Sequence, residues 1–266
     1  MKRTRIGIIG AGSMGAAIIR GLAKTPGRQV MVAEQDTAKR RQLQRRFGVG
    51  TGSIQQLTKD CSAIIICVKP QDLDAVLAEL RRDIRPGTTV ISIAAGISTA
   101  YLLHGCGQGI PVVRVMPNLP GQIGEGISAF CLGKGAGNAQ RRLTKQLFAG
   151  LGETIEVREV HMDAVTAISG SGPGFIAYLI QCLIDAGRNA GLSPVTAEHL
   201  VLKTLLGTAL ILTQQKIAPQ ELVRRVASPG GTTEAGLAKL RQHRVPAIMQ
   251  AVVAAAMGRA KQLRRR

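Results

Sequence analysis

The chain has 266 residues, 45% of them hydrophobic, and a formal charge of +19 with no tryptophan and only two tyrosines. This length is enough for one large domain or two ordinary domains with cores of their own. The five cysteines form no CxxC pair and have no histidine at ligand spacing, which argues against a metal site and predicts reduced thiols in the cytoplasm.

The positive charge has two interpretations, a nucleic-acid surface or a solubilising field that attracts anionic cofactors and substrates. The basic residues are spread along the chain, as at Arg40-Arg41, Arg81-Arg82 and Arg224-Arg225. Few aromatic side chains are present to stack on bases. We favour the second interpretation and expect no nucleic-acid partner.

A glycine-rich turn follows a short apolar run near the N-terminus. Arg5 to Ile9 has the length of a buried parallel strand, and Gly10-Ala11-Gly12-Ser13-Met14-Gly15 comes directly after it, before a stretch with helical spacing. Gly10 permits the tight turn, Gly12 lets a pyrophosphate approach, and Gly15 lets the helix pack on the strand. We expect this motif to bind NADPH or NADH.

The second predicted strand, Gln29 to Ala33, ends at Glu34. Folds of this type place an acid here on the ribose hydroxyls of the adenosine, which favours NADH. The cations Lys39, Arg40 and Arg41 follow closely and are candidates for the 2′-phosphate of NADPH, or for the exposed face of a helix. The choice of cofactor stays open at this point.

Alternation of strands and helices continues to about Glu159. The predicted elements are the strands Ala63–Val68, Thr88–Ile93, Pro111–Val115, Gly126–Leu132 and Glu153–Val157 and the helices Asp72–Arg82 and Asn138–Leu151. Carboxyl ends of parallel strands line the ligand crevice of such a sheet. We therefore expect Val68-Lys69-Pro70, Ala94-Ala95-Gly96 and Met116-Pro117-Asn118 to lie along one cofactor.

After Pro173 the pattern is helical only. The predicted helices are Phe175–Ala190, Val195–Gln214, Pro219–Ala227, Thr233–Gln242 and Pro246–Leu263. Leu200 to Leu212 is apolar nearly all round, and we expect a second subunit to complete its burial, with the centre of a monomeric bundle as the alternative. The predicted fold is an α/β Rossmann-type dinucleotide-binding domain, residues 1–159, followed by an all-α helical dimerisation domain, residues 160–266.

The uncharged run from Ala164 to Ile184 is interrupted by Ser169-Gly170-Ser171-Gly172-Pro173-Gly174. We expect these residues to form a loop that leads into a buried helix, and we expect no membrane span.

A second glycine-rich stretch, Ser228-Pro229-Gly230-Gly231-Thr232-Thr233, lies where a helix is predicted to begin. Helix N-termini attract anions such as carboxylates. Together with Ser169–Gly174 it forms a candidate substrate pocket that holds hydroxyls but no strong base. Reduction of a protonated imine needs mainly a positioned ring and a held carboxylate, so this composition favours an imine substrate.

These motifs, with Val68-Lys69-Pro70-Gln71 and Arg114-Val115-Met116-Pro117-Asn118, stand in the order found in pyrroline-5-carboxylate reductase, and the chain resembles that family over almost its whole length. The resemblance implies reduction of 1-pyrroline-5-carboxylate to L-proline by hydride from NADPH or NADH. It implies that Thr233 contacts the ring nitrogen while Ser228 and the backbone of Gly230, Gly231 and Thr232 hold the carboxylate. Glu159 and Ser171 are further substrate-binding candidates. It also implies a homodimer through the helical domain, or a decamer built from such dimers.

Other interpretations stay open. The chain departs from the family pattern at Gly15, at Leu119, at Gly174-Phe175 and at Lys216, which keeps a paralogous reductase of another cyclic imine, such as piperideine carboxylate, in view. A β-hydroxyacid dehydrogenase needs a lysine in the first long helix of the second domain, and Phe175 to Ala190 has none. The large charge keeps a non-catalytic nucleotide-binding regulator as a third possibility.

Overall fold

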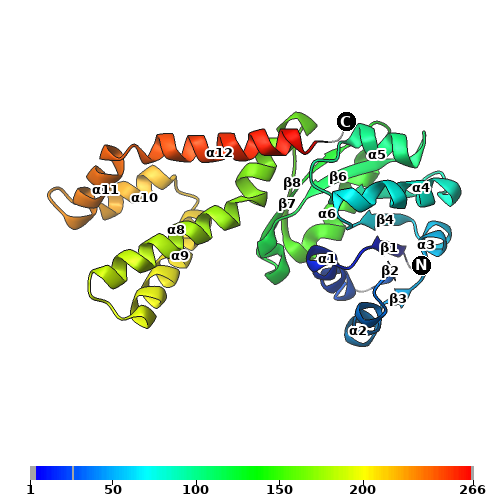
Figure 1. The fold of residues 1–266 in the computed structure, drawn as a ribbon, viewed down its shortest axis with the longest axis horizontal. Coiled ribbons are helices and arrows are strands. Elements are labelled where there is room, and N and C mark those ends of the chain that lie inside the picture. Colours follow the sequence, from blue (N-terminus) through cyan, green and yellow to red (C-terminus); the bar gives the residue numbers. More distant parts are fainter. Residues whose placement is uncertain (1–3, 26, 265–266) are drawn as a thin grey trace. The chain divides into compact units, whose positions relative to one another are not determined.

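The structure is a computed structural model, and it describes residues 4–25 and 27–264. Its contacts divide the chain into two compact units, Met1–Ser171 with Ala255–Arg266, and Gly172–Ala254. Every strand described lies in the first unit, whereas the second contains helices alone (Figure 1). The predicted fold class, an α/β Rossmann-type domain followed by helices, is confirmed.

The first unit is built on one sheet with the strand order β3-β2-β1-β4-β5-β6-β7-β8. Its strands are β1 Thr4–Ile9, β2 Arg28–Ala33, β3 Gly50–Thr51, β4 Ala63–Ile66, β5 Thr89–Ser92, β6 Val112–Met116, β7 Gly126–Leu132 and β8 Gly152–Glu156. All pairs from β3 to β6 are parallel, and β7 runs antiparallel to β6. The order reverses between β1 and β4, the switch point at which such sheets bind ligands.

Helices cover both faces of this sheet (Figure 1). They are α1 Ser13–Ala23, α2 Thr37–Phe47, α3 Ile54–Asp60, α4 Leu73–Asp83, α5 Thr99–Cys106, α6 Asn138–Phe148 and the short α7 Met162–Val165. One apolar core joins Ile8 to Ile18 of α1 and Phe148 of α6. The other joins Ile64 to α3, α4 and α5. The near-continuous apolar strands follow from this burial on both sides.

Most predicted elements of this unit appear within a few residues of their expected bounds, but several elements were missed, among them β3, α3, α5 and α7. Strand β3 has only two residues, too few for a periodic signal. Helix α3 begins with a capping box between Ser53 and Gln56, a local signal that was present in the sequence. Helix α5 follows the N-cap Ser98, whose hydroxyl accepts the N–H of Tyr101.

The second unit contains α8 Gly172–Asn189, α9 Pro194–Gln215, α10 Pro219–Val226, α11 Thr232–Gln242 and most of α12 Val245–Gln262. All five predicted helices are present. The predicted loop at Ser169–Gly174 is wrong, because Thr166–Gly170 is a π-helix, η5, and α8 begins at Gly172. Pro173 is tolerated in the first turn of α8, where a backbone N–H has no helical partner to lose.

The contacts within the chain place the boundary between the two units after Ser171, whereas the sequence predicted a domain boundary after Glu159. Residues 160–171 cluster with the first unit, where Met162 and Asp163 are buried. The C-terminal residues from Ala255 cluster there as well.

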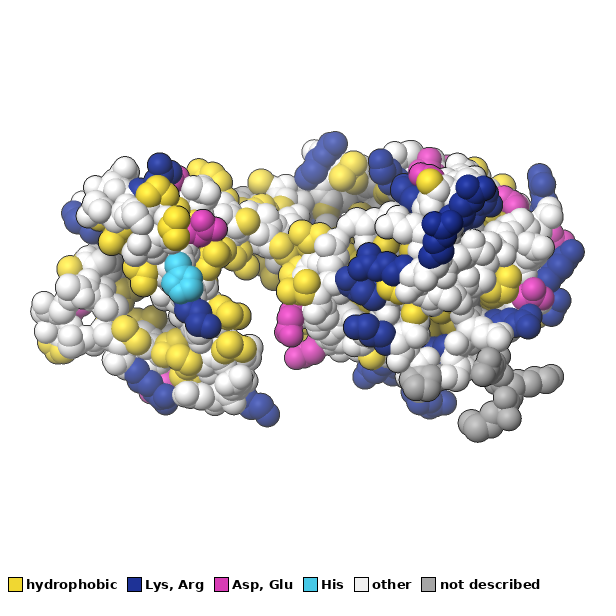
Figure 2. Space-filling view, turned by 90° about the horizontal axis from the view of Figure 1, so that it is seen from below, with side chains coloured by type: hydrophobic (Ala, Val, Ile, Leu, Met, Phe, Trp, Pro, Cys, Tyr) yellow, Lys and Arg dark blue, Asp and Glu magenta, His cyan; other side chains and the backbone are white. Residues whose placement is uncertain are grey.

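Large apolar side chains are exposed on the helices of the second unit (Figure 2). Leu206 on α9 is 54% exposed and Leu183 on α8 is 53% exposed. By length and composition alone, Glu159–Asn189 and Pro194–Gln215 are also apolar enough to cross a membrane. Apolar patches of this kind mark interaction surfaces in soluble proteins, as the predicted second subunit requires.

We predict that Leu206→Glu separates the subunits, because a carboxylate in a dry apolar contact loses its hydration without gaining a partner. Light scattering coupled to gel filtration should show the native protein as an oligomer and Leu206→Glu at a lower mass. The control Gln55→Glu, an equal change of charge on α3, should keep the native mass. A monomeric native protein would contradict the prediction.

Candidate active site

The glycine-rich turn after β1 leaves the N-terminus of α1 open to an anion. Gly10 has φ +89°, and a Cβ at Gly15 would collide with the carbonyl oxygen of Gly10. By contrast, a Cβ at Gly12, the N-cap residue, would meet no atom within 4 Å, and no side chain caps the helix there. The turn therefore has the tight bend, the close helix packing and the open approach that a pyrophosphate needs.

Neighbouring strand ends meet this turn as predicted. A Cβ at Gly10 would lie 3.0 Å from the Val68 side chain, which follows β4. Lys69, whose side chain is exposed, caps the short 3₁₀ helix η1, Pro70–Asp72. The turn after β1 and the loop after β4 thus lie together at the switch point of the sheet.

Glu34 lies where the sequence predicted it, directly after β2. Its Oε2 accepts the N–H of Ala11 at 2.7 Å, and its Oε1 accepts the N–H of Asp36 at 3.0 Å. Asp36 in turn caps α2 by accepting the N–H groups of Ala38 and Lys39. The carboxylate of Glu34 is held against the glycine-rich turn.

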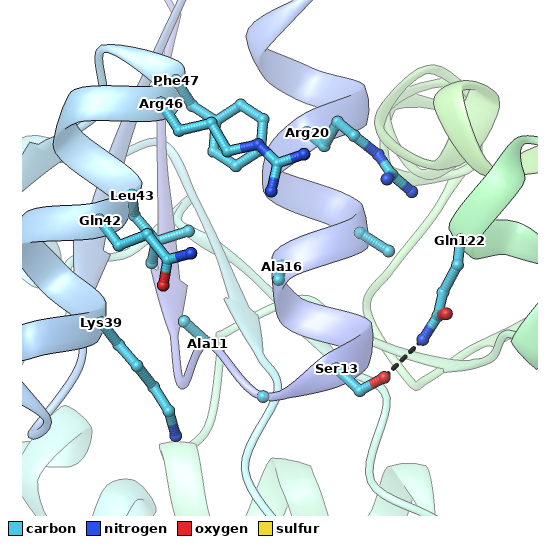
Figure 3. Close-up of a pocket in the computed structure, with 12 residues that line it drawn as sticks. Ala11, Ser13, Ala16, Arg20, Lys39, Gln42, Leu43, Arg46, Phe47 and Gln122 are labelled. Atoms are coloured by element: carbon cyan, nitrogen blue, oxygen red, sulfur yellow. Dashed lines mark hydrogen bonds between the residues drawn. The ribbon is translucent and has the colours of Figure 1, made fainter.

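A hollow of about 410 Å³ lies between α1 and α2 beside the same turn (Figure 3). Ser13 and Gln122 stand on one side, and the Gln122 amide donates to the Ser13 hydroxyl. The lining includes Arg20, Lys39 and Arg46 and no carboxylate. The hollow therefore has a positive potential next to the expected phosphates.

The two remaining predicted cofactor loops are held by contacts within the first unit. In Ala94-Ala95-Gly96, the Ala94 N–H donates to the Ser92 hydroxyl at 3.2 Å, and Gly96 has φ +74°. The Asn118 Oδ1 accepts the N–H of Ile127 at 2.9 Å and so holds the start of β7. Contacts of these residues and of Met14 with a cofactor stay predictions.

Glu159 belongs to an ionic cluster around a buried arginine, and sequence reasoning missed this cluster. Its Oε1 lies 3.5 Å from Nη1 of Arg114 on β6, a residue that is 3% exposed. The same carboxylate accepts the N–H of Thr99 at 2.7 Å and the Thr99 hydroxyl at 2.5 Å. Desolvation lowers the pKa of the Arg114 guanidinium, although Cys131 and Glu159 oppose this shift. A charge within an apolar strand was the available signal, because such a charge requires a partner.

The predicted substrate motif Ser228–Thr233 forms the turn between α10 and α11. Gly230 has φ +67°, and the Gly231 N–H donates to the Ser228 carbonyl at 3.0 Å. Gly231 caps α11 with no side-chain hydrogen bond, so Thr232 and Thr233 form its first turn. The structure thus gathers these candidate residues at one helix N-terminus, where a carboxylate is stabilised.

Two details of the substrate motifs were not foreseen. The Gly230 N–H, expected to hold the substrate carboxylate, donates to Oε2 of Glu234 at 2.7 Å. Ser171 lies at the end of the π-helix in the first unit, where its N–H donates to the Thr166 carbonyl at 2.8 Å. The Glu234 contact depends on side-chain direction within a helix turn, which the motif alone does not specify.

Among the residues that the structure describes, no group of three or more histidine, cysteine or acidic side chains could hold a metal. The cysteines there are free thiols, and burial raises the pKa of Cys61 to about 11 and of Cys106 to about 12. These thiols are protonated at neutral pH, and the chemistry of the site rests on other groups.

Comparison with known proteins decides the family. The chain is 36% identical to "Pyrroline-5-carboxylate reductase" of Pseudomonas aeruginosa over 99% of its length and 98% of the relative's. It is 38% identical to the protein of that name from Synechocystis over 97% of its length and 98% of the relative's. The chain belongs to the pyrroline-5-carboxylate reductase family.

Family models and solved structures agree with this assignment. Residues 159–263 match the model "Pyrroline-5-carboxylate reductase dimerisation", and residues 5–96 match "NADP oxidoreductase coenzyme F420-dependent". The pyrroline-5-carboxylate reductase of Coxiella burnetii superposes with a TM-score of 0.95 at 28% identity, covering 99% of this chain and all of that one. The Plasmodium falciparum reductase, solved with NADP bound, gives 0.86 at 28% identity over 99% of both chains.

In this reductase-family chain we predict that Glu159→Ala lowers the free energy of unfolding by roughly 2 kcal/mol, because it leaves the buried Arg114 charge without its partner. Glu159→Gln keeps an acceptor for Thr99 and should lose less. Urea unfolding followed by circular dichroism measures both. Equal stability of Glu159→Ala and the native protein would show that the cluster contributes nothing.

Proposed function

We propose that this protein reduces 1-pyrroline-5-carboxylate to L-proline with NADH or NADPH as the hydride donor. The observation that carries the proposal is the Ser228–Thr233 turn, in which a positive-φ glycine precedes a helix N-terminus that has no side-chain cap and carries two threonines in its first turn. Full-length similarity to proteins named pyrroline-5-carboxylate reductase supports the same substrate. We also propose a homodimer formed through α8 and α9, which builds into a decamer, and a cytoplasmic location.

When bound, the nicotinamide cofactor would supply the hydride, and the protein would hold the cofactor and the substrate in position. The open N-terminus of α1 at Gly12 holds the pyrophosphate of the cofactor. The N-terminus of α11, with the Ser228 hydroxyl beside Gly231, holds the substrate carboxylate, which replaces Glu234 at the Gly230 N–H. A protonated imine already attracts a hydride, so the ring needs orientation rather than a strong acid or base.

Thr233 orients the ring. It is half-buried in the first turn of α11 and follows Thr232 directly. In the sequence it is therefore next to the residues proposed to hold the carboxylate. A hydroxyl of ordinary pKa does not protonate the imine outright, but it accepts or donates a hydrogen bond to the ring nitrogen and relays a proton from water. Thr233 and Ser228 are therefore the residues that we assign to catalysis.

The reaction is tested by following cofactor oxidation with the five-membered and six-membered cyclic imine carboxylates, each with NADH and NADPH. We expect turnover with the five-membered imine and a much lower kcat/KM with the six-membered one. A preference for the six-membered ring would identify a paralogous reductase. Cofactor binding without turnover of either imine would favour a regulatory protein.

We predict that Thr233→Ala lowers kcat at least about tenfold, the effect of losing an orienting hydrogen bond, while the Kd of NADH stays within about twofold. Thr233→Ser keeps the hydroxyl and should retain most of the rate. The control Thr154→Ala, at a half-buried threonine on β8, should behave as the native enzyme. An unchanged kcat in Thr233→Ala would remove Thr233 from the mechanism.

A further inference from the structure

The turn between β2 and α2 presents two carboxylates where an adenosine ribose is expected. In sheets of this type the ribose lies outside the carboxyl end of the second strand. Glu34 follows β2 directly, and Asp36 stands two residues later. A 2′-phosphate, which distinguishes NADPH from NADH, would enter this turn with a charge of its own.

Hydrogen bonds fix the carboxylate of Glu34 in that position. One oxygen accepts the Ala11 N–H at 2.7 Å and the other accepts the Asp36 N–H at 3.0 Å, so the group is tied to both loops that enclose the ribose site. Each carboxylate oxygen has a further lone pair, so each can still accept a hydrogen bond from a ribose hydroxyl. Rotation of the side chain away from an incoming phosphate would break both bonds.

Asp36 adds a second negative charge to the turn. The backbone N–H of Lys39 lowers the pKa of the Asp36 carboxyl, with help from the N–H of Ala38 and from the Lys39 charge. Asp36 is therefore ionised at neutral pH.

Cations nearby are directed to other partners. The Lys39 ammonium lies 3.9 Å from the Asp36 carboxylate, and its side chain lines the hollow between α1 and α2 (Figure 3). The Arg40 guanidinium donates to the Thr37 hydroxyl at 3.0 Å. Arg41 lines a separate hollow with Arg45 and Ala38 on α2. Lys39 and Arg40 thus contact partners other than Glu34, and Arg41 lines a hollow that Glu34 does not line.

We propose that Glu34 makes this protein select NADH over NADPH, by accepting the hydroxyls of the adenosine ribose and repelling a 2′-phosphate. The inference rests on the proposed function as a nicotinamide-dependent reductase. It sets the chain apart from the Plasmodium falciparum relative solved with NADP and from the NADP named in the matching family model.

Isothermal titration of the purified full-length protein with NADH and NADPH, in the absence of any imine, tests the proposal. We expect NADH to bind about tenfold more tightly than NADPH, since the repulsion of two like charges at close range near a protein surface is large enough to supply that factor. Glu34→Gln should bring the two Kd values together, because the amide keeps an acceptor for Ala11 and removes the charge. Adenosine diphosphate ribose and its 2′-phosphate should repeat the pattern without a nicotinamide.

Two controls separate Glu34 from general charge effects. Glu153→Gln makes the same charge change on the exposed edge strand β8, at the far end of the sheet from β2, and should leave the ratio of Kd values at its native value. Lys39→Ala should weaken both cofactors to the same extent.

Equal or tighter binding of NADPH by the native protein would overturn the proposal, and so would a native ratio in a folded Glu34→Gln variant. A changed ratio of the two Kd values in Lys39→Ala, with a native ratio in Glu34→Gln, would assign selection to the lysine instead. Because no imine is present, a failure of the proposed reaction leaves these binding results unaffected. If Glu34→Gln does not fold, the proposal is still tested by the ratio of the two Kd values in the native protein and in Lys39→Ala.

Discussion

The buried Arg114 guanidinium imposes a constraint on the whole first unit, because an ion at 3% exposure requires a charged partner. Glu159 provides that partner at 3.5 Å and uses its second oxygen on the Thr99 hydroxyl at the start of α5. This carboxylate stands at the first residue of the family's dimerisation region. A second ion pair, Asp163 with Arg264, anchors the chain after α12 to the same unit. Both ion pairs thus join segments of the first unit that are far apart in the sequence.

In the proposed mechanism, the backbone of two glycine turns forms the binding sites. Gly10, at φ +89°, shapes the turn that exposes the N-terminus of α1, and Gly230, at φ +67°, shapes the turn that exposes the N-terminus of α11. In the proposed mechanism each helix start attracts one anion, the cofactor pyrophosphate in the first case and the substrate carboxylate in the second. An imine reductase needs little proton chemistry, and a site of glycines and hydroxyls meets that need.

The sequence predicted every described strand except β3, most helices and both glycine turns, because apolar periodicity and glycine spacing are local signals. It did not predict the partners of the charged groups. The contacts of Glu159 with Arg114, of Glu34 with Ala11 and of Glu234 with Gly230 join loops or depend on side-chain direction, which no local pattern records. The helical state of Ser169–Gly170 and of Gly172–Gly174 was also missed, since closely spaced glycines normally favour a loop. Contacts of the substrate candidates with a ligand stay predictions.

Transfer of deuterium from the cofactor to the product shows whether the protein reduces the C=N bond of the imine. NADH with deuterium at both C4 positions is oxidised by the protein in the presence of 1-pyrroline-5-carboxylate, and the product is analysed by mass spectrometry and NMR. We expect L-proline with one deuterium at C5 for each NADH consumed. Unlabelled proline, label at any other carbon, or no oxidation of NADH or NADPH would contradict it.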